Sequence, residues 1–250
     1  MNSTAKTEPA PDIIGMAIRD YYTGNYTEDI ITETSISEED ILPVPYLFRD
    51  YGQMPEIEQV ALMMARGKVL DIGCGAGSHA LYLQQQKQLD VTAADTSPGA
   101  VEICKKRGVS KTVNSDIMDY NETGFDTVLL LMNGLGLCGK LDRIGTFLLH
   151  LKSLLGPGGQ ILLDSSDILY MFDEDEDGGK WIPSFPAYYG ELEFRMRYKN
   201  VQGPSFPWLF CDYNTLQNAA AVHGFDCELL LEGAHHDYLA RLTPVSATSP

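Results

Sequence analysis

The stretch Val69-Leu-Asp-Ile-Gly-Cys-Gly-Ala-Gly77 decides the fold. Its first four residues are a short, mostly apolar run of the kind that forms a buried strand, and residues 78–86 after it have the pattern of a helix. Glycines at 73, 75 and 77 remove side chains from the turn between them. A ligand can then approach the backbone closely, and the N-terminus of the helix offers free N–H groups. The stretch therefore predicts a ligand-binding turn between a strand and a helix.

Outward from this turn, strands and helices alternate. Residues 91–94, 111–114, 127–132 and 160–164 have the pattern of strands, and residues 98–107 and 142–155 that of helices. Continuous apolar strands that alternate with helices indicate a parallel sheet covered on both faces. After residue 167 the pattern changes to strands at 191–199 and 206–213, a helix at 214–223 and two close strands at 227–231 and 238–242. We predict an α/β fold, a Rossmann-like, mostly parallel seven-stranded sheet with helices on both faces and a C-terminal antiparallel hairpin.

The sequence pattern predicts that the chain has three parts. Residues 1–54 are expected to form an acidic N-terminal arm that covers the domain. Residues 55–242 are expected to form the domain itself, with an inserted antiparallel strand pair at about 170–213 and a helix that Asn214 caps. Residues 243–250 are expected to be a flexible tail.

Charge excludes whole classes of partner. The chain has 18 Lys and Arg against 35 Asp and Glu, a formal charge of −17. Residues 1–45 and the acidic run at 173–177, which we read as a solvated loop, hold most of this excess. Nucleic acids and anionic membranes bind to basic faces, so neither is an expected partner. The sequence shows no apolar stretch long enough for a membrane helix, no signal-peptide pattern and no paired spacing among five cysteines, which predicts a cytoplasmic protein with reduced thiols and no metal centre.

Three acids follow three successive strands. Asp71, at the end of the first strand, would repel a pyrophosphate and attract an ammonium group. Asp95 closes the next strand, 24 residues later. A carboxylate at that place can accept from both hydroxyls of a ribose. Asp116 follows the third strand and could accept from the amino group of an adenine.

These residues resemble the class I S-adenosylmethionine-dependent methyltransferases. The resemblance covers residues 55–170 and consists of Asp71 with its three glycines, Asp95, Asp116, Phe125-Asp126 and Leu155-Gly-Pro-Gly-Gly159. It implies S-adenosyl-L-methionine as the cofactor, with its methionine part in the glycine turn, its ribose at Asp95 and its adenine beside Asp116 and Ile117. The expected cofactor-binding residues are Asp71, Gly73, Cys74, Gly75, Gly77, Asp95, Thr96, Asp116, Ile117, Met132 and Asn133.

The expected reaction is direct in-line transfer of a methyl group to an oxygen, nitrogen or carbon of a small molecule. Candidates for the acceptor pocket lie in an aromatic segment before the first strand, at a strand end and in the insertion: Tyr46, Arg49, Asp167, Tyr188 and Tyr189. Asn133 is followed by Gly134 and Leu135, where methyltransferases acting on nucleobase or glutamine nitrogens have two prolines, and this disfavours such acceptors. No residue is identified as catalytic.

Two other functions stay open. A non-catalytic module could bind the same cofactor without transferring a methyl group. An NAD(P)-dependent oxidoreductase is less favoured, because the spacing here is G-x-G-x-G and the dinucleotide fingerprint is G-x-G-x-x-G. For Arg49 we favour a surface salt bridge over pairing with a carboxylate of the cofactor or acceptor. His79 could face either the cofactor or the solvent. Asp164 with Asp167, or His235 with His236, could ligate a metal ion. We favour the interpretation that the first pair ends a strand and that the second lies in a solvated turn.

Overall fold

The main sheet of the computed structural model, which describes residues 10–175, 177, 179–182 and 188–245, confirms the predicted architecture. Its seven strands lie in the order β11-β12-β7-β6-β3-β4-β5. Strands β3 to β7 are parallel, and the C-terminal hairpin of β11 and β12 joins the edge of β7 in antiparallel register. The strands are β3 (Lys68–Ile72), β4 (Asp90–Asp95), β5 (Lys111–Asn114), β6 (Phe125–Leu130), β7 (Leu155–Ser166), β11 (Phe225–Glu232) and β12 (Asp237–Pro244).

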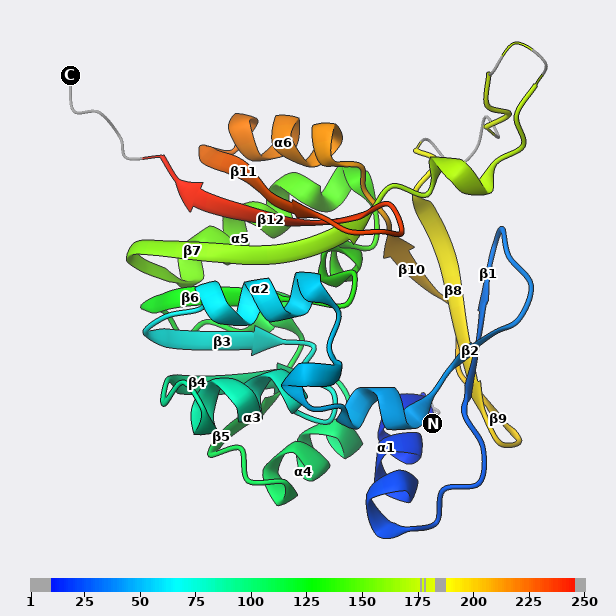
Figure 1. Cartoon of the computed structure of the whole chain (residues 1–250), viewed down its shortest axis with the longest axis vertical. Coiled ribbons are helices and arrows are strands. Elements are labelled where there is room, and N and C mark those ends of the chain that lie inside the picture. Colours follow the sequence, from blue (N-terminus) through cyan, green and yellow to red (C-terminus); the bar gives the residue numbers. More distant parts are fainter. Residues whose placement is uncertain (1–9, 176, 178, 183–187, 246–250) are drawn as a thin grey trace, which may run out of the picture.

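Helices cover both faces of this sheet because successive residues of each strand point to opposite sides. Val69 and Leu129 pack with helices α2 (Glu56–Met64), α3 (Ser78–Gln85) and α4 (Pro98–Lys106). Their neighbours Leu70 and Leu130 pack on the other side with α5 (Ile144–Leu154) and α6 (Tyr213–Val222). An apolar core thus lies on each side of the sheet, beneath the helices that Figure 1 shows on its two faces.

Several boundaries differ from those predicted. The cap of α6 is Asp212, whose side chain accepts from Thr215 N at 2.9 Å, and not Asn214. Strand β6 ends at Leu130, two residues early, because Met132 and Asn133 both adopt left-handed φ angles of 67° and 55°. Strand β12 continues through Pro244, inside the predicted tail. The tail beyond residue 245 and the first nine residues of the predicted arm lie outside the described residues.

A second, five-stranded sheet lies across the carboxyl ends of the parallel strands (Figure 1). It joins the predicted strands of the insertion to two strands from the N-terminal segment. The sequence did not indicate these two strands because both are short and β1 is largely polar. Its order is β10-β8-β1-β2, with β9 paired to β8. The strands are β1 (Ile30–Thr34), β2 (Asp40–Leu42), β8 (Glu191–Tyr198), β9 (Val201–Gln202) and β10 (Phe206–Leu209).

Helix α1 (Ile13–Thr23) fixes the N-terminal segment to the main domain. The carboxylate of Asp12 caps it by accepting from Gly15 N and also accepts from Gly99 N in the first turn of α4, both at 2.9 Å. A Cβ on Gly15 would lie 2.7 Å from the Cα of Gly99, so the two helices touch through glycine backbone.

Short 3₁₀ helices connect the larger elements: η1 (Val44–Phe48), η2 (Tyr51–Gln53), η3 (Ile117–Asp119), η4 (Gly134–Cys138), η5 (Leu141–Arg143) and η6 (Leu169–Met171). Within the part of the chain that the structure describes, no helix has both the length and the apolar character needed to cross a bilayer.

Candidate functional site

The glycine turn joins the end of β3 to the N-terminus of α3. Its backbone is fixed by Gly73 N and Cys74 N, which donate to Ala94 O at 2.9 and 3.1 Å. Gly75 has a φ of 52°, and a Cβ there would meet nothing within 4 Å, so the turn has an open face at this residue. Gly77 serves packing instead, since its Cβ would lie 2.6 Å from the sulfur of Cys104. The turn is therefore open where a ligand can approach and closed where α4 packs.

Asp95, at the end of β4, connects the glycine turn to the neighbouring strand. Its carboxylate accepts from Gly75 N at 2.9 Å and from Ser97 N at 2.8 Å. Each carboxylate oxygen has two lone pairs, so both oxygens can accept a further hydrogen bond. Burial raises the pKa of this carboxyl, while the amides of Ser97 and Gly75 lower it. Thr96 is exposed beside it and its carbonyl accepts from Asn114 at 2.9 Å.

Asp116 and Ile117 follow β5, the strand that pairs with β4 and its terminal Asp95. Ser115 N donates to Asp95 O at 3.1 Å, which holds the two ends together. One oxygen of the exposed Asp116 carboxylate caps η3 by accepting from Met118 N at 2.9 Å. Ile117 is buried and gives this end of the site an apolar side chain.

Asp71 is the most unusual carboxylate of the site. It is 1% exposed, and its Oδ2 is one of two buried side-chain atoms among the described residues that have no hydrogen-bond partner. Burial raises its pKa to about 6, and the nearby charges of His79 and Asp95 act on it in opposite directions. An unpaired buried acceptor is costly to leave in an apolar environment. Asp71 Oδ2 therefore has lone pairs free to accept a further hydrogen bond.

The second unpartnered atom is Nε of Arg49, and the surface salt bridge that we predicted for this arginine is wrong. Arg49 is 6% exposed and pairs with the buried carboxylate of Glu58 through Nη2, while Nη1 donates to Tyr46 O at 2.5 Å. Glu58 also bonds to Nε2 of His79 at 2.7 Å, so His79 faces inward. Sequence reasoning missed Glu58, although an acid four residues before Leu62 on the apolar face of a helix was a usable signal.

The aromatic segment around η1 is fixed directly to the glycine turn. Ser78 Oγ donates to Leu47 O at 3.0 Å, and the guanidinium of Arg107 lies over the ring of Phe48 while it donates to Ala76 O. Tyr46 is half-buried, with the Arg49 guanidinium 3.8 Å from its ring centre. Burial raises the pKa of Tyr46.

Met132 and Asn133 follow β6 with left-handed backbones, and Asn133 connects this end of the main sheet to the second sheet. The amide of Asn133 donates to Leu209 O at 3.2 Å and its carbonyl accepts from Ser165 Oγ at 3.0 Å. Buried Asp164 accepts from Gly134 N at 2.8 Å, and burial raises its pKa to about 6. Two consecutive left-handed, non-glycine residues cost conformational energy, and these bonds stabilise them.

The other candidates for the acceptor pocket, Asp167, Tyr188 and Tyr189, form hydrogen bonds with other groups of the protein. Tyr189 OH donates to Asp167 Oδ1 at 2.8 Å, and the same oxygen accepts from Leu169 N. Tyr188 OH donates to Asp212 Oδ2 at 2.7 Å and accepts from Asp212 N at 3.0 Å. The Tyr189 hydroxyl thus connects the insertion to the segment after β7, and the Tyr188 hydroxyl connects it to the N-cap of α6.

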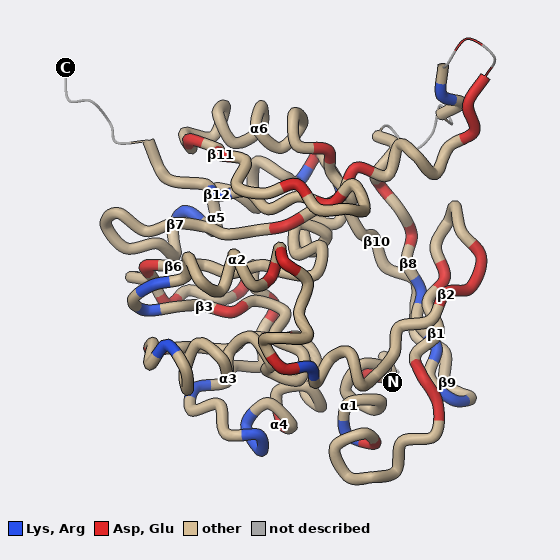
Figure 2. Tube along the Cα trace, viewed as in Figure 1, with Lys and Arg blue, Asp and Glu red and all other residues tan. Residues whose placement is uncertain are grey.

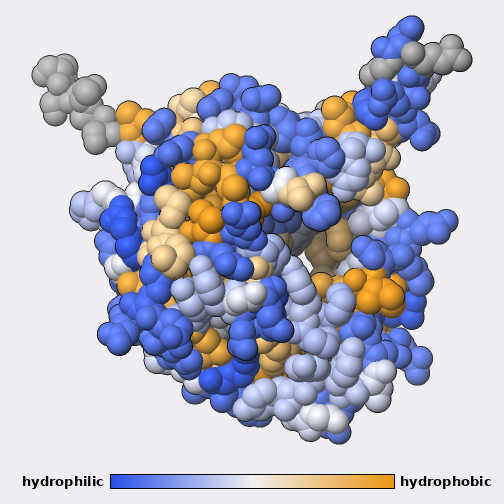
Figure 3. Space-filling view, in the orientation of Figure 1, coloured by the Kyte–Doolittle hydropathy of each residue, from blue (hydrophilic) through white to orange (hydrophobic). Residues whose placement is uncertain are grey.

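The inner face of the second sheet adds an aromatic wall that sequence reasoning missed, since it follows from strand register. Phe194, Phe206 and Trp208 are half-buried, with ring centres 5.9 to 6.3 Å apart. A Cβ on Gly136 of η4 would lie 2.1 Å from Trp208, and Leu137 approaches Gly73. Figure 3 shows a hollow between this sheet and the main domain.

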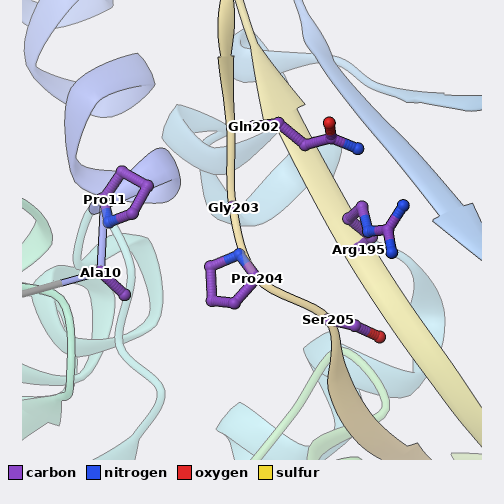
Figure 4. A pocket seen from close by; sticks show the side chains of 7 residues that line it. All are labelled: Ala10, Pro11, Arg195, Gln202, Gly203, Pro204 and Ser205. Atoms are coloured by element: carbon purple, nitrogen blue, oxygen red, sulfur yellow. The ribbon is translucent and has the colours of Figure 1, made fainter.

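Asp and Glu residues are spread over both sheets and their connecting loops, with fewer Lys and Arg residues among them (Figure 2). A separate surface pocket of about 540 Å³ lies between the start of α1 and strands β8 to β10, with Ala10 and Pro11 facing Gly203 and Pro204 (Figure 4). Its one charged side chain, Arg195, is exposed. The unpartnered polar atoms therefore belong to the glycine-turn site and not to this pocket.

Comparisons with known proteins agree with this geometry. Residues 69–159 match the family model described as a methyltransferase domain. No protein with a curated description matches the chain significantly. A SAM-dependent methyltransferase from Bacteroides fragilis, crystallised with S-adenosyl-L-homocysteine, is 46% identical with a TM-score of 0.86, and the match covers 94% of this chain and 95% of that chain.

Two less similar structures share the fold. A DhpI–SAH complex is 18% identical with a TM-score of 0.57, and the match covers 94% of this chain and 96% of that one. The sugar N-methyltransferase KedS8 from Streptoalloteichus is 15% identical with a TM-score of 0.55, over 86% of this chain and 98% of that one.

The 46% identity extends over nearly the whole length of both chains. The resemblance carried by the glycine turn and its three acids is confirmed, and the cofactor is S-adenosyl-L-methionine. The chain belongs to the family of S-adenosylmethionine-dependent methyltransferases.

Proposed function

We propose that this methyltransferase acts on a small-molecule acceptor held in the hollow between its two sheets, with the cofactor along the ends of β3, β4 and β5. The acceptor part of this proposal is carried by one observation, the aromatic wall of Phe194, Phe206 and Trp208 that faces the ends of β6 and β7. Apolar and aromatic side chains in a concave site are typical of small-molecule pockets.

The residues of the site fit the amino-acid part of the cofactor. In the described part of the chain, the two buried side-chain atoms without partners are an acceptor on an acid, Asp71 Oδ2, and a donor on a base, Arg49 Nε. An α-amino acid group carries an ammonium and a carboxylate, which have the complementary charges. Asp71 would hold the ammonium and Arg49 the carboxylate, above the open turn at Gly75.

The adenosine part fits the next two strand ends. The carboxylate of Asp95 can accept from ribose hydroxyls with the lone pairs that Gly75 and Ser97 leave free. The free oxygen of Asp116 could accept from the adenine amino group, and Ile117 would pack against the ring. Gly73, Cys74, Gly77, Thr96, Met132 and Asn133 would complete the cofactor site, through backbone or packing.

The cofactor supplies an activated methyl group on a sulfonium, so the chain has to align the acceptor and exclude water. We assign the alignment to the aromatic wall and Tyr46, with Asp167, Tyr188 and Tyr189 fixing the insertion that closes the hollow. Residues 1–54 and the insertion at about 170–213 would act as its cover. The acidic surface supports a small molecule over a nucleic acid, because a polyanion would be repelled.

The experiment combines binding and turnover. Titration calorimetry with S-adenosylhomocysteine should give a dissociation constant of micromolar order, which corresponds to a binding free energy of about −8 kcal/mol. Release of S-adenosylhomocysteine is then measured with a panel of metabolite amines, alcohols and carbon acids, and with an RNA and an unfolded protein as controls. Turnover with the RNA or the protein, and with no metabolite, would contradict the proposed acceptor class.

A further inference from the structure

A buried chain of three titratable side chains lies beside the proposed amino-acid site. Arg49, Glu58 and His79 come from η1, α2 and α3, and they are 6%, 3% and 9% exposed. Both oxygens of Glu58 accept from Nη2 of Arg49, and one of them is also 2.7 Å from Nε2 of His79. Three segments separated in the sequence thus meet at one carboxylate.

Stability alone explains this arrangement poorly. Removing two charges from water costs about as much as their pairing returns, so a buried ion pair adds little net stability. The pairing does, however, determine the direction of the guanidinium. Glu58 binds Nη2, the carbonyl of Tyr46 binds Nη1, and the ring of Tyr46 lies 3.8 Å from Cζ. Nε is the part of the guanidinium that stays without a partner.

The two unpartnered atoms, Arg49 Nε and Asp71 Oδ2, belong to side chains of opposite charge. Both side chains interact with the same carboxylate, that of Glu58. The charges of Glu58 and His79 act on the carboxyl of Asp71. A mobile Arg49 side chain would be attracted to Asp71, and an ion pair between them would block the acceptor that an ammonium needs. A fixed guanidinium leaves both atoms available.

We propose that Glu58 is a positioning residue that holds Arg49 with Nε directed to the cofactor carboxylate and keeps it away from Asp71. This inference rests on the proposed assignment of Arg49 and Asp71 to the amino-acid part of the cofactor. His79 fixes the second side of the Glu58 carboxylate, so that the carboxylate itself does not turn.

The test uses two ligands that differ in the amino-acid part. S-adenosylhomocysteine carries it, and 5′-deoxy-5′-methylthioadenosine lacks it. Calorimetry is done on the full chain, on Glu58→Gln and on Glu56→Gln, an exposed acid of the same helix. Glu58→Gln should weaken S-adenosylhomocysteine binding roughly tenfold, the loss typical of one charge-assisted hydrogen bond, and leave methylthioadenosine binding within about twofold. Glu56→Gln should change neither.

Equal weakening of both ligands by Glu58→Gln would show a merely structural role and overturn the proposal, as would no change in either. If Glu58→Gln does not fold, as judged by circular dichroism, Glu58→Asp replaces it, because it keeps the charge and withdraws the carboxylate from Arg49. It should show the same selective loss to a smaller extent. If the unmodified chain binds both ligands equally, the assignment of Arg49 and Asp71 is wrong and the inference falls with it. If the unmodified chain prefers S-adenosylhomocysteine but Glu58→Gln weakens the binding of both ligands equally, only the proposed role of Glu58 is overturned.

Discussion

The two halves of the opening treat their polar groups in different ways. At the ends of β3 to β5, Asp71 has an oxygen with no partner, and Asp95 and Asp116 have lone pairs to spare. At the ends of β6 and β7, Asn133 and Asp164 are bonded to backbone and side chains of the protein itself. The polar groups of the first half can still form hydrogen bonds with a ligand. Those of the second half are already bonded within the protein, where they support the aromatic wall.

In the proposed function, the two halves select their ligands in different ways. A ligand in the first half would be selected by charge and hydrogen bonds. A ligand in the second half would meet an aromatic surface and would be selected mainly by its shape. Substitutions in the second sheet, which forms that surface, would then leave the cofactor site unchanged.

The substitution that should weaken cofactor binding most is at Asp71, and Asp164, a buried acid with a similarly raised pKa, serves as its control. Asp71→Asn should weaken S-adenosylhomocysteine binding by about 3 kcal/mol, because a buried ammonium loses its counter-charge. Asp164→Asn should leave this binding unchanged. At pH 7 both variants should be more stable without ligand, by up to about 3 kcal/mol, since a pKa of about 6 reflects the cost of a buried charge. Calorimetry and urea unfolding measure both quantities, and equal binding losses would contradict the division of the opening.

The next effect is on the ribose. Asp95→Ala should weaken S-adenosylhomocysteine binding by about 1.5–3 kcal/mol, the order expected for hydrogen bonds to a charged group. Asp90→Ala at the other end of the same strand removes an exposed ion pair with Lys111 and serves as the matched control. Comparable losses in the two variants would argue against a ribose site at Asp95.

The pH dependence of stability sharpens the comparison. The pKa values of Asp71 and Asp164 rise from 3.8 to about 6 on folding, so the native state binds more protons than the unfolded state between pH 4 and 6. Stability without ligand must then fall as pH rises through this window, and between pH 5 and 7 each carboxyl should contribute a loss of about 1.3 kcal/mol. Urea unfolding of the chain and of the Asp71→Asn, Asp164→Asn double variant isolates this contribution, and identical slopes would refute it.

The smallest effect concerns the support of the aromatic wall. Asn133→Ala removes the side-chain donor to Leu209 O and the acceptor of the Ser165 hydroxyl, and it should lower the free energy of unfolding by about 1 kcal/mol. Binding of S-adenosylhomocysteine should change little if Asn133 contributes to the cofactor site through its backbone alone. A loss as large as that of Asp95→Ala would place its side chain in the cofactor site instead.

Much of the main sheet could be predicted from local patterns. The glycine turn, the acids at three strand ends and the alternation of strands and helices depend on residues close in sequence, so they are visible without tertiary contacts. The N-terminal strands were missed because β1, Ile-Ile-Thr-Glu-Thr, is short and largely polar, and its pairing with β8 joins residues more than 150 positions apart.

The fold class, the glycine-rich turn and the acids at three strand ends were visible in the sequence by itself, because they follow from periodicity and from one short motif. Tertiary structure alone decided that Arg49 is buried against Glu58 and that Phe194, Phe206 and Trp208 share one face. Ion pairing and strand register join distant parts of the chain, and no local pattern specifies which residues will meet.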